Sequence, residues 1–288
     1  MQTQPRNVGR VIAVAALATL VFSILRRLDL FLPMGNSLAA RGWSLPPILA
    51  VMVLARMAFS AIATLIALPQ ILGVALSEWL PDAVKCDRRA TLLGLLSFTV
   101  FGLLASAISL GMGIHKGDWS ALLARPDIHP DPDVVGWGYF LLALVPGIWE
   151  ELAFRGLILS RLRKALPAWV SILLSSVLFS LFHLTNLATQ APSAAIGGVA
   201  MSLLFGLTWG VMTVRTGSVL PAMLSHYLVD SMGQPFLNVA TSDPVQATIF
   251  FLTLTLAFPI VNTALTVMMY PGERRQERYT AGTEATPA

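Results

Sequence analysis

The stretch GIWEELAFRG, residues 147–156, decides how this chain is interpreted. It lies within an apolar run, near 136–160, that has the length and composition of a membrane span. The stretch nevertheless carries two adjacent carboxylates, Glu150 and Glu151, and Arg155 follows the second by four residues. Ionisable side chains are costly at membrane depth, so they are normally paired or functional. The function therefore depends on which other side chains meet these carboxylates.

The composition excludes a soluble domain. Of the 288 residues 56% are hydrophobic and only 12% are charged, whereas soluble domains carry about 25% charged residues. The net charge of +4 does not indicate nucleic-acid binding, because Lys and Arg fall in short clusters between apolar runs. The single cysteine, Cys86, excludes an intramolecular disulfide and a multi-cysteine metal site.

We expect an all-α polytopic membrane protein with about eight transmembrane helices, since a span needs about 20 apolar residues. The first span should stay uncleaved, because Arg26 and Arg27 follow it directly without a small-residue cleavage site. Arg56 and Pro69 interrupt the overlong second run and predict a tilted, kinked or partly interfacial segment. The expected spans are 9–25, one within 46–79, 91–114, 136–160, 168–188, 193–214, 217–238 and 245–270.

The distribution of ionisable side chains within the predicted spans divides the chain into four parts. Residues 1–135 hold spans one to three and few candidate catalytic side chains. Residues 136–240 hold a predicted catalytic core on spans four to seven. The last span occupies 241–270, and the polar tail 271–288 is expected to be disordered.

Loop charges predict the orientation in the membrane. The clustered basic residues all fall on one side of the eight-span arrangement, and that side also receives both termini. These residues are Lys85, Arg88, Arg89, Arg161, Arg163, Lys164, Arg215, Arg274, Arg275 and Arg278. The loop with Arg26, Arg27 and Arg41 is the exception. We expect an integral protein of the bacterial inner (plasma) membrane with cytoplasmic termini, because the short loops and the uncleaved first span look bacterial.

Six charged or histidine side chains lie inside predicted spans four to seven: Glu150, Glu151, Arg155, His183, His226 and Asp230. Glu151 and Arg155 are four residues apart, which predicts a structural ion pair on one helix face. Glu150 points about 100° away from Glu151 and has no cation at helical spacing, so we expect it to face other spans. Asp230 shares a face with His226 and can orient its ring.

This set of side chains supports hydrolysis. A carboxylate and a histidine that converge on one water form a general base, and a second histidine can stabilise negative charge on a carbonyl oxygen. The same groups offer an alternative, a divalent metal such as zinc that would activate the water. Its ligands would be Glu150, His183, His226 and Asp230.

Three ordered motifs carry a family resemblance. Glu150-Glu151-x-x-x-Arg155, Phe179-x-x-x-His183 and His226-x-x-x-Asp230 resemble the motifs of the CPBP family. That family contains the type II CAAX prenyl endopeptidases and the bacterial CAAX protease or bacteriocin-processing (Abi) proteins. The resemblance covers roughly residues 136–236.

The resemblance implies an eight-helix intramembrane endopeptidase whose catalytic cavity opens to the cytosolic side. It implies that Glu150 and His183 activate the attacking water, and that His226 and residue 230 stabilise the oxyanion. The eukaryotic enzymes carry Asn where this chain has Asp230. Because an ionised Asp only accepts hydrogen bonds, we expect Asp230 to orient His226 or to bind a metal.

The expected partners are the lipid bilayer and a peptide or protein substrate reached from the membrane or the cytosol, and no cofactor is expected. Processing of a peptide, or immunity against a peptide toxin, suits a bacterial chain better than cleavage of a prenylated protein. Two other functions stay open. One is a non-catalytic scaffold or immunity protein of the same fold, and the other is a proton-coupled transporter.

Overall fold

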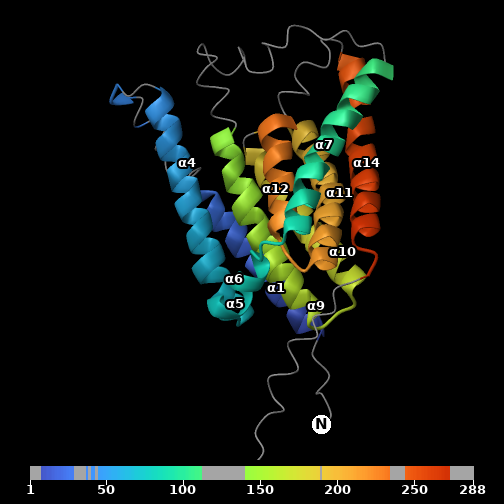
Figure 1. Ribbon diagram of the computed structural model, residues 1–288. Helices are drawn as coiled ribbons and strands as arrows, with labels where there is room; N and C mark the ends of the chain where they lie inside the picture. Colours follow the sequence, from blue (N-terminus) through green and yellow to red (C-terminus); the bar gives the residue numbers. More distant parts are fainter. Residues whose placement is uncertain are drawn as a thin grey trace, which may run out of the picture.

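A computed structural model describes residues 8–28, 37, 40–42, 45–111, 140–188, 190–233 and 244–272. All secondary structure within these residues is helical, which confirms the all-α prediction (Figure 1). Six of the described helices are long and apolar enough to cross a membrane. The predicted spans at 136–160 and 217–238 are helical over 140–160 and 220–233 but are not among these six.

The long apolar helices account for the six candidate spans and are joined by shorter pieces. The segments are α1 (Val8–Arg26), α4 (Leu45–Ile62), η1 (Ala63–Ala67), α5 (Leu68–Leu72), α6 (Leu76–Ala83), α7 (Arg88–Gly111), η3 (Val145–Glu150), η4 (Leu152–Leu159), α9 (Ser160–Arg163), α10 (Ala168–Phe182), η5 (His183–Ala188), α11 (Pro192–Thr216), α12 (Leu220–Leu228), η6 (Val229–Gly233) and α14 (Pro244–Met269). Residues 112–139 and most of the predicted disordered tail lie outside the described residues.

Proline and glycine mark where several helices begin and end. Pro192 opens α11 and Pro221 lies in the first turn of α12, where the missing backbone N–H leaves no hydrogen bond unmade. Gly217 ends α11 in the left-handed conformation, with φ 69°, and its N–H donates to the Thr213 carbonyl. These residues set the reversal between α11 and α12.

The second apolar run does not end where the sequence predicts an interruption. It continues through Arg56 and Pro69 as α4, η1 and α5, because Pro69 falls in the first turn of α5 after a π-helical turn. The run ends at Gly73, which adopts a left-handed φ of 62°. The short helix α6 is therefore a separate element rather than the end of the span.

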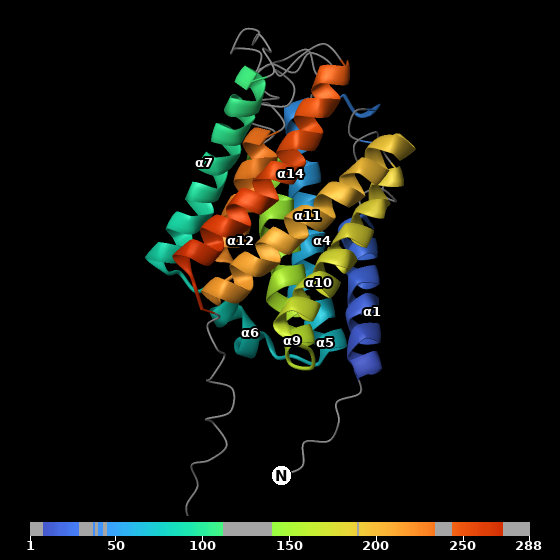
Figure 2. The ribbon, with the colours of Figure 1, turned by 90° about the vertical axis from the view of Figure 1, so that its right-hand side faces the viewer.

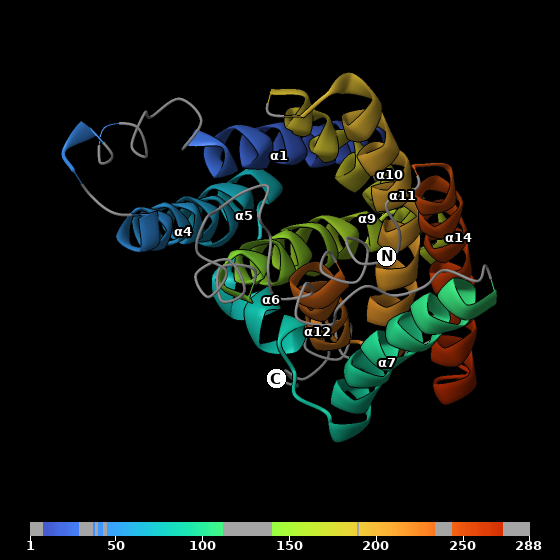
Figure 3. The ribbon, with the colours of Figure 1, turned by 90° about the horizontal axis from the view of Figure 1, so that it is seen from above.

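The helices form a bundle around the segment that carries the two carboxylates. α10 packs against α11, while α7 packs against α12 and α14. Seen from above, α1 lies beside α10 on one flank, and α7 and α14 lie on the opposite flank (Figures 2 and 3). All eight residues of η4 are buried. The motif segment is thus the centre of the bundle.

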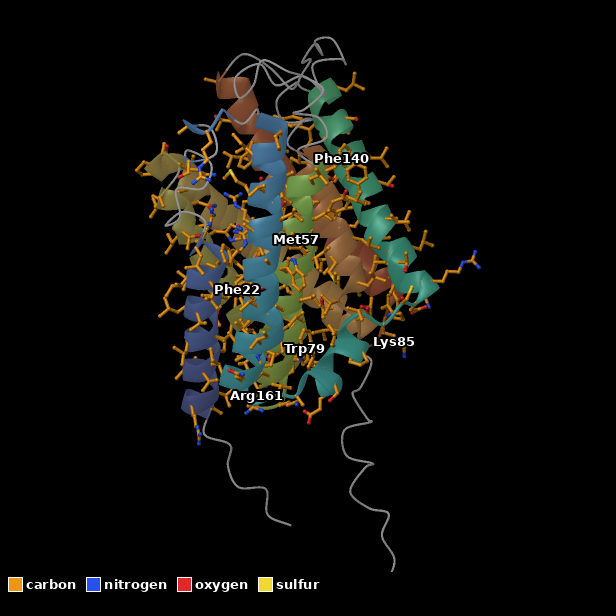
Figure 4. All side chains as sticks on the ribbon, turned by 90° about the vertical axis from the view of Figure 1, so that its left-hand side faces the viewer. Phe22, Met57, Trp79, Lys85, Phe140 and Arg161 are labelled. Carbon is orange, nitrogen blue, oxygen red and sulfur yellow. The ribbon has the colours of Figure 1, made fainter. Side chains whose placement is uncertain are left out.

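The predicted basic clusters gather at one end of the bundle. Figure 4 shows Lys85 and Arg161 near the end where α1 begins, and Phe140 toward the opposite end. At the basic end Arg215 donates a 2.9 Å hydrogen bond to the Pro271 carbonyl, and the Arg89 guanidinium lies 4.9 Å from the centre of the Tyr270 ring. The bundle therefore has a basic end that contains Val8 and Tyr270.

Candidate active site

The motif helix is wound as two π-helical segments, η3 and η4, separated by Glu151. Such segments are rare and frequently occur at functional sites. Pro146 lies in the first turn of η3, and Gly147 follows it. A Cβ at residue 147 would lie 2.7 Å from the Tyr227 Cβ, so only glycine lets η3 approach α12 this closely. This approach brings the glutamates near His226.

Glu151 joins two helices. Its Oε2 lies 3.2 Å from Arg155 Nε, which confirms the predicted ion pair. Its Oε1 lies 2.8 Å from His226 Nδ1, a contact that the sequence did not predict. The predicted role of Glu151 was therefore incomplete, because its side chain contacts a second helix as well as Arg155. Glu151 has no exposed surface, so both contacts replace water entirely.

Arg155 holds the Glu151 side chain in place and is itself held by α11 and α10. Its Nη2 donates to the Gly206 carbonyl at 3.3 Å, and its guanidinium carbon lies 4.2 Å from the centre of the Phe179 ring. A buried guanidinium needs such partners, because an unpaired charge is strongly unfavourable there. Arg155 does not line the cavity described below, and its contacts are those of a structural cation.

Glu150 is paired by a residue from outside the motifs. Its Oε1 lies 2.5 Å from Nη2 of Arg26, the last residue of α1. The Glu150 side chain is only 2% exposed. Its second oxygen, Oε2, has no hydrogen-bond partner among the described residues. Helical spacing indicated no cation for Glu150, and the cation comes instead from the first span.

His183 presents one ring nitrogen as an acceptor. Its Nδ1 lies 2.9 Å from the Phe179 carbonyl oxygen, four residues earlier. A carbonyl only accepts, so Nδ1 carries the hydrogen, and in the neutral ring Nε2 keeps its lone pair. The rings of Phe179 and Phe182 hold the imidazole by edge contacts, at centroid distances of 4.7 and 5.1 Å.

His226 lies between two carboxylates. Its Nδ1 faces Glu151, and its Nε2 lies 3.4 Å from Asp230 Oδ2. The Trp209 ring is stacked on the imidazole at a centroid distance of 4.0 Å and an angle of 19°. The distance to Asp230 supports the predicted orienting role of this residue, which stays a prediction.

One cavity of about 430 Å³ collects most of the predicted site. Glu150, His183, His226 and Asp230 line it, whereas Glu151 lies behind His226 and is not among the lining residues. The size falls within the range of about 300–1,000 Å³ that is usual for ligand sites. Polar groups from four segments of the chain thus face a shared space.

Arginines from the first two spans also line this cavity: Arg26, Arg27 and Arg56. The sequence analysis placed all candidate site residues on spans four to seven and did not include these arginines. One signal was available, because Arg26 and Arg27 violate the charge pattern of the other loops. The structure gives the reason: their side chains enter the protein rather than marking its cytoplasmic side.

The cavity lies in the half of the bundle away from the basic end. Arg26 ends α1, and Asn186 follows the top of α10, while Phe251 belongs to the first turns of α14. The basic end holds the opposite ends of the same helices (Figure 1). The sequence predicts a cytosolic opening and cytoplasmic termini, and both stay predictions.

The four candidate metal ligands do not fit a metal site in this arrangement. No three His, Cys, Asp or Glu side chains gather around a common point in the described part of the chain. Glu150 faces Arg26, and His226 directs its two nitrogens to two carboxylates. Glu150 Oε2 and His183 Nε2 remain as donor atoms, but both nitrogens of His226 are directed to carboxylates, so the four residues do not present one complete ligand set.

These features define a polytopic helical membrane protein with a buried glutamate and histidine site. Residues 132–232 match the family model described as Rce1-like, type II CAAX prenyl endopeptidase Rce1-like. This match confirms the resemblance over residues 132–232. Neither the curated proteins nor the solved structures compared with the chain gave a match.

Proposed function

We propose that this protein is an intramembrane endopeptidase that hydrolyses a peptide bond of a membrane-associated protein or peptide. The observation that carries the proposal is the shared cavity of Glu150 and His183 within the segment that matches a protease family. Glu150 Oε2 and His183 Nε2 are both acceptors toward which a water can donate. Glu150 takes one proton from that water as its oxygen attacks the scissile carbonyl, while His183 accepts a hydrogen bond from the same water, and the proton then passes to the leaving nitrogen as the C–N bond breaks.

His226 supplies the stabilising charge in this proposal. An imidazole donates through both nitrogens at once only when it carries two protons, and here each nitrogen faces a carboxylate. Such a cation at the cavity wall favours the negative charge that develops on the carbonyl oxygen. Glu151 and Asp230 hold the ring in place, and Asp230 does not itself donate.

The proposed route uses protein groups in place of a metal ion, because both nitrogens of His226 already face carboxylates and Glu150 Oε1 faces Arg26. Treatment of the purified protein with a zinc chelator should therefore leave the rate of peptide cleavage unchanged. A loss of activity that added zinc restores would contradict this route. The wild-type protein in buffer without chelator is the control.

The site of substrate entry follows from the charge pattern. If the basic end is cytoplasmic, as the positive-inside rule indicates, the cavity occupies the outer half of the membrane. Substrates then reach it from the lipid or from the outer face, and cytosolic access is the alternative that applies if the basic end faces outward. A peptide that is embedded in or attached to the membrane suits this position.

Two substitutions test the function directly. Glu150→Gln and His183→Ala should each lower cleavage of a fluorogenic membrane-peptide library in proteoliposomes by about 10²–10⁴-fold. Glu78→Gln, the same chemical change at an exposed glutamate, should retain the wild-type rate.

The outcomes separate the alternatives. Turnover retained by Glu150→Gln would remove that residue as the base. A phenotype that survives both substitutions, without cleavage by the wild type, would favour a non-catalytic scaffold. Solute flux that stops in both variants would favour a transporter.

A further inference from the structure

The first helix ends with two consecutive arginines, and both side chains reach elements of the candidate site. Arg26 is the last residue of α1, and Arg27 follows it. Neither residue belongs to the segment that matches the protease family, 132–232. Both line the cavity together with Glu150 and His183.

Arg26 contacts the candidate base itself. Its Nη2 lies 2.5 Å from Glu150 Oε1, and its side chain is 13% exposed. Its guanidinium carbon also lies 5.2 Å from the centre of the Phe182 ring, next to His183. A planar guanidinium with a carboxylate at one edge and an aromatic ring at its face has few alternative positions. The geometry therefore restricts Glu150 as well.

Arg27 contacts the other half of the site. Its Nη2 donates to the side-chain carbonyl of Asn186, which lies three residues after His183 in η5. One turn earlier on α1, Phe22 packs against Phe154 and Phe182 at centroid distances of 5.7 and 5.5 Å. The end of α1 thus contacts both the glutamate segment and the histidine segment.

We propose that Arg26 is a positioning residue for Glu150 and that α1 is part of the active site. The inference rests on the proposed function. Arg26 holds Oε1 and leaves Oε2, which has no hydrogen-bond partner among the described residues, for the attacking water. Arg27 supports the same geometry by holding η5 behind His183.

This role differs from the binding of a substrate anion. A positioning residue changes the rate of the chemical step, because a displacement of about 1 Å at the reacting groups costs about 10²-fold. A residue that binds an anionic part of the substrate changes KM with little effect on kcat. The two roles are therefore separable by kinetics.

The kinetic test uses Arg26→Gln and Arg26→Lys in proteoliposomes with the fluorogenic membrane-peptide library. Arg26→Gln should lower kcat by about 10²-fold and leave KM within about twofold of the wild type. Arg26→Lys should recover part of kcat, because it restores the charge but not the planar fork. Arg10→Gln, the same change at an exposed arginine near the start of α1, should behave as the wild type.

A second measurement does not depend on turnover. A hydrophobic carbodiimide modifies buried carboxyl groups, and tandem mass spectrometry separates Glu150 from Glu151. Modification of Glu150 should be faster in Arg26→Gln than in the wild type and in Arg10→Gln, at equal folded fractions in a thermal unfolding assay. A merely structural role would lower the folded fraction without this selective change at Glu150.

The possible results have distinct meanings. If the wild type cleaves, Glu150→Gln does not, and Arg26→Gln cleaves normally, the positioning role is overturned and the proposed function stands. A raised KM with unchanged kcat also overturns it. If the wild type cleaves nothing, both proposals fail. Reduced kcat, constant KM and faster modification of Glu150 together support the positioning role.

Discussion

Glu150 and Glu151 are neighbours in the chain, yet their side chains have different partners and different surroundings. Glu151 has no exposed surface and lies between Arg155 and His226. Glu150 lines the cavity, and Arg26 pairs only one of its oxygens. The first glutamate is thus placed to act on a ligand, while the second holds the protein groups that surround the ligand.

This difference predicts that substitution of Glu151 mainly lowers stability, whereas substitution of Glu150 mainly lowers activity. Glu151→Gln leaves the Arg155 guanidinium buried without its counter-ion, which should lower the free energy of unfolding by about 3–5 kcal/mol. The double variant Glu151→Gln with Arg155→Met should recover much of this loss, since no isolated charge remains. Thermal unfolding in detergent measures both, with exposed Glu78→Gln as the control. A wild-type melting midpoint for Glu151→Gln would contradict the structural role.

At the scale of the elements, the site depends on close approach between helices. η3 meets α12 at Gly147 and Tyr227, and the approach places Glu151 against His226. Behind His226, Trp209 Nε1 donates to Ser225 Oγ at 3.0 Å. Small residues at helix interfaces allow such packing in membranes, where lipid gives helices no hydrophobic reason to associate.

Gly147→Ala tests this interface. The added Cβ would lie 2.7 Å from the Tyr227 Cβ and 2.9 Å from its Cα, so the two helices must separate. Overpacking of this kind costs about 1–3 kcal/mol and should lower the melting midpoint. Activity should fall further than the folded fraction, because Glu151 and His226 move apart.

Gly102→Ala is the matched control, because nothing lies within 4 Å of a Cβ at that position in α7. Its midpoint should equal or exceed that of the wild type, since alanine favours a helix over glycine by about 1 kcal/mol. Equal midpoints for the two variants would show that η3 and α12 do not need this contact.

At the scale of the whole molecule, the bundle is polarised. The basic end contains the start of α1, the end of α14 and Lys85 (Figures 1 and 4), whereas Arg26, Asn186 and Phe251, which line the cavity, belong to the opposite ends of their helices. If the basic end is cytoplasmic, as the loop charges predict, the cavity reaches into the outer half of the membrane. Arg26 and Arg27 are compatible with this orientation, because their charges are used within the protein.

Cysteine labelling in intact cells tests the polarity. Cys86 is exposed at the basic end, so a membrane-impermeant maleimide should label it only after the cells are opened. Leu187→Cys in a Cys86→Ser background places a thiol at an exposed position beside the cavity half, and it should react in intact cells. A permeant maleimide should label both variants. The reverse pattern would place the cavity on the cytosolic side, and labelling of both from one side would contradict the bundle polarity.

Much of the fold was predictable because membrane helices are encoded locally. A run of about 20 apolar residues specifies a span without reference to the rest of the chain. The observed α1, α7 and α14 accordingly agree with the expected spans within a few residues. The break at Gly73 was missed, because Pro69 is a stronger helix-breaking signal than an isolated glycine in sequence.

Part of the candidate site was predictable from the sequence. The contacts within one helix could be predicted, and those between helices could not, for a physical reason. Helical spacing reports which side chains share one helix face, and it correctly paired Glu151 with Arg155 and placed His226 near Asp230. It carries no information on which faces of different helices meet. The contacts of Glu150 with Arg26, and of Glu151 with His226, join residues 124 and 75 positions apart. Only the packing of α1, η3 and α12 against one another decided them.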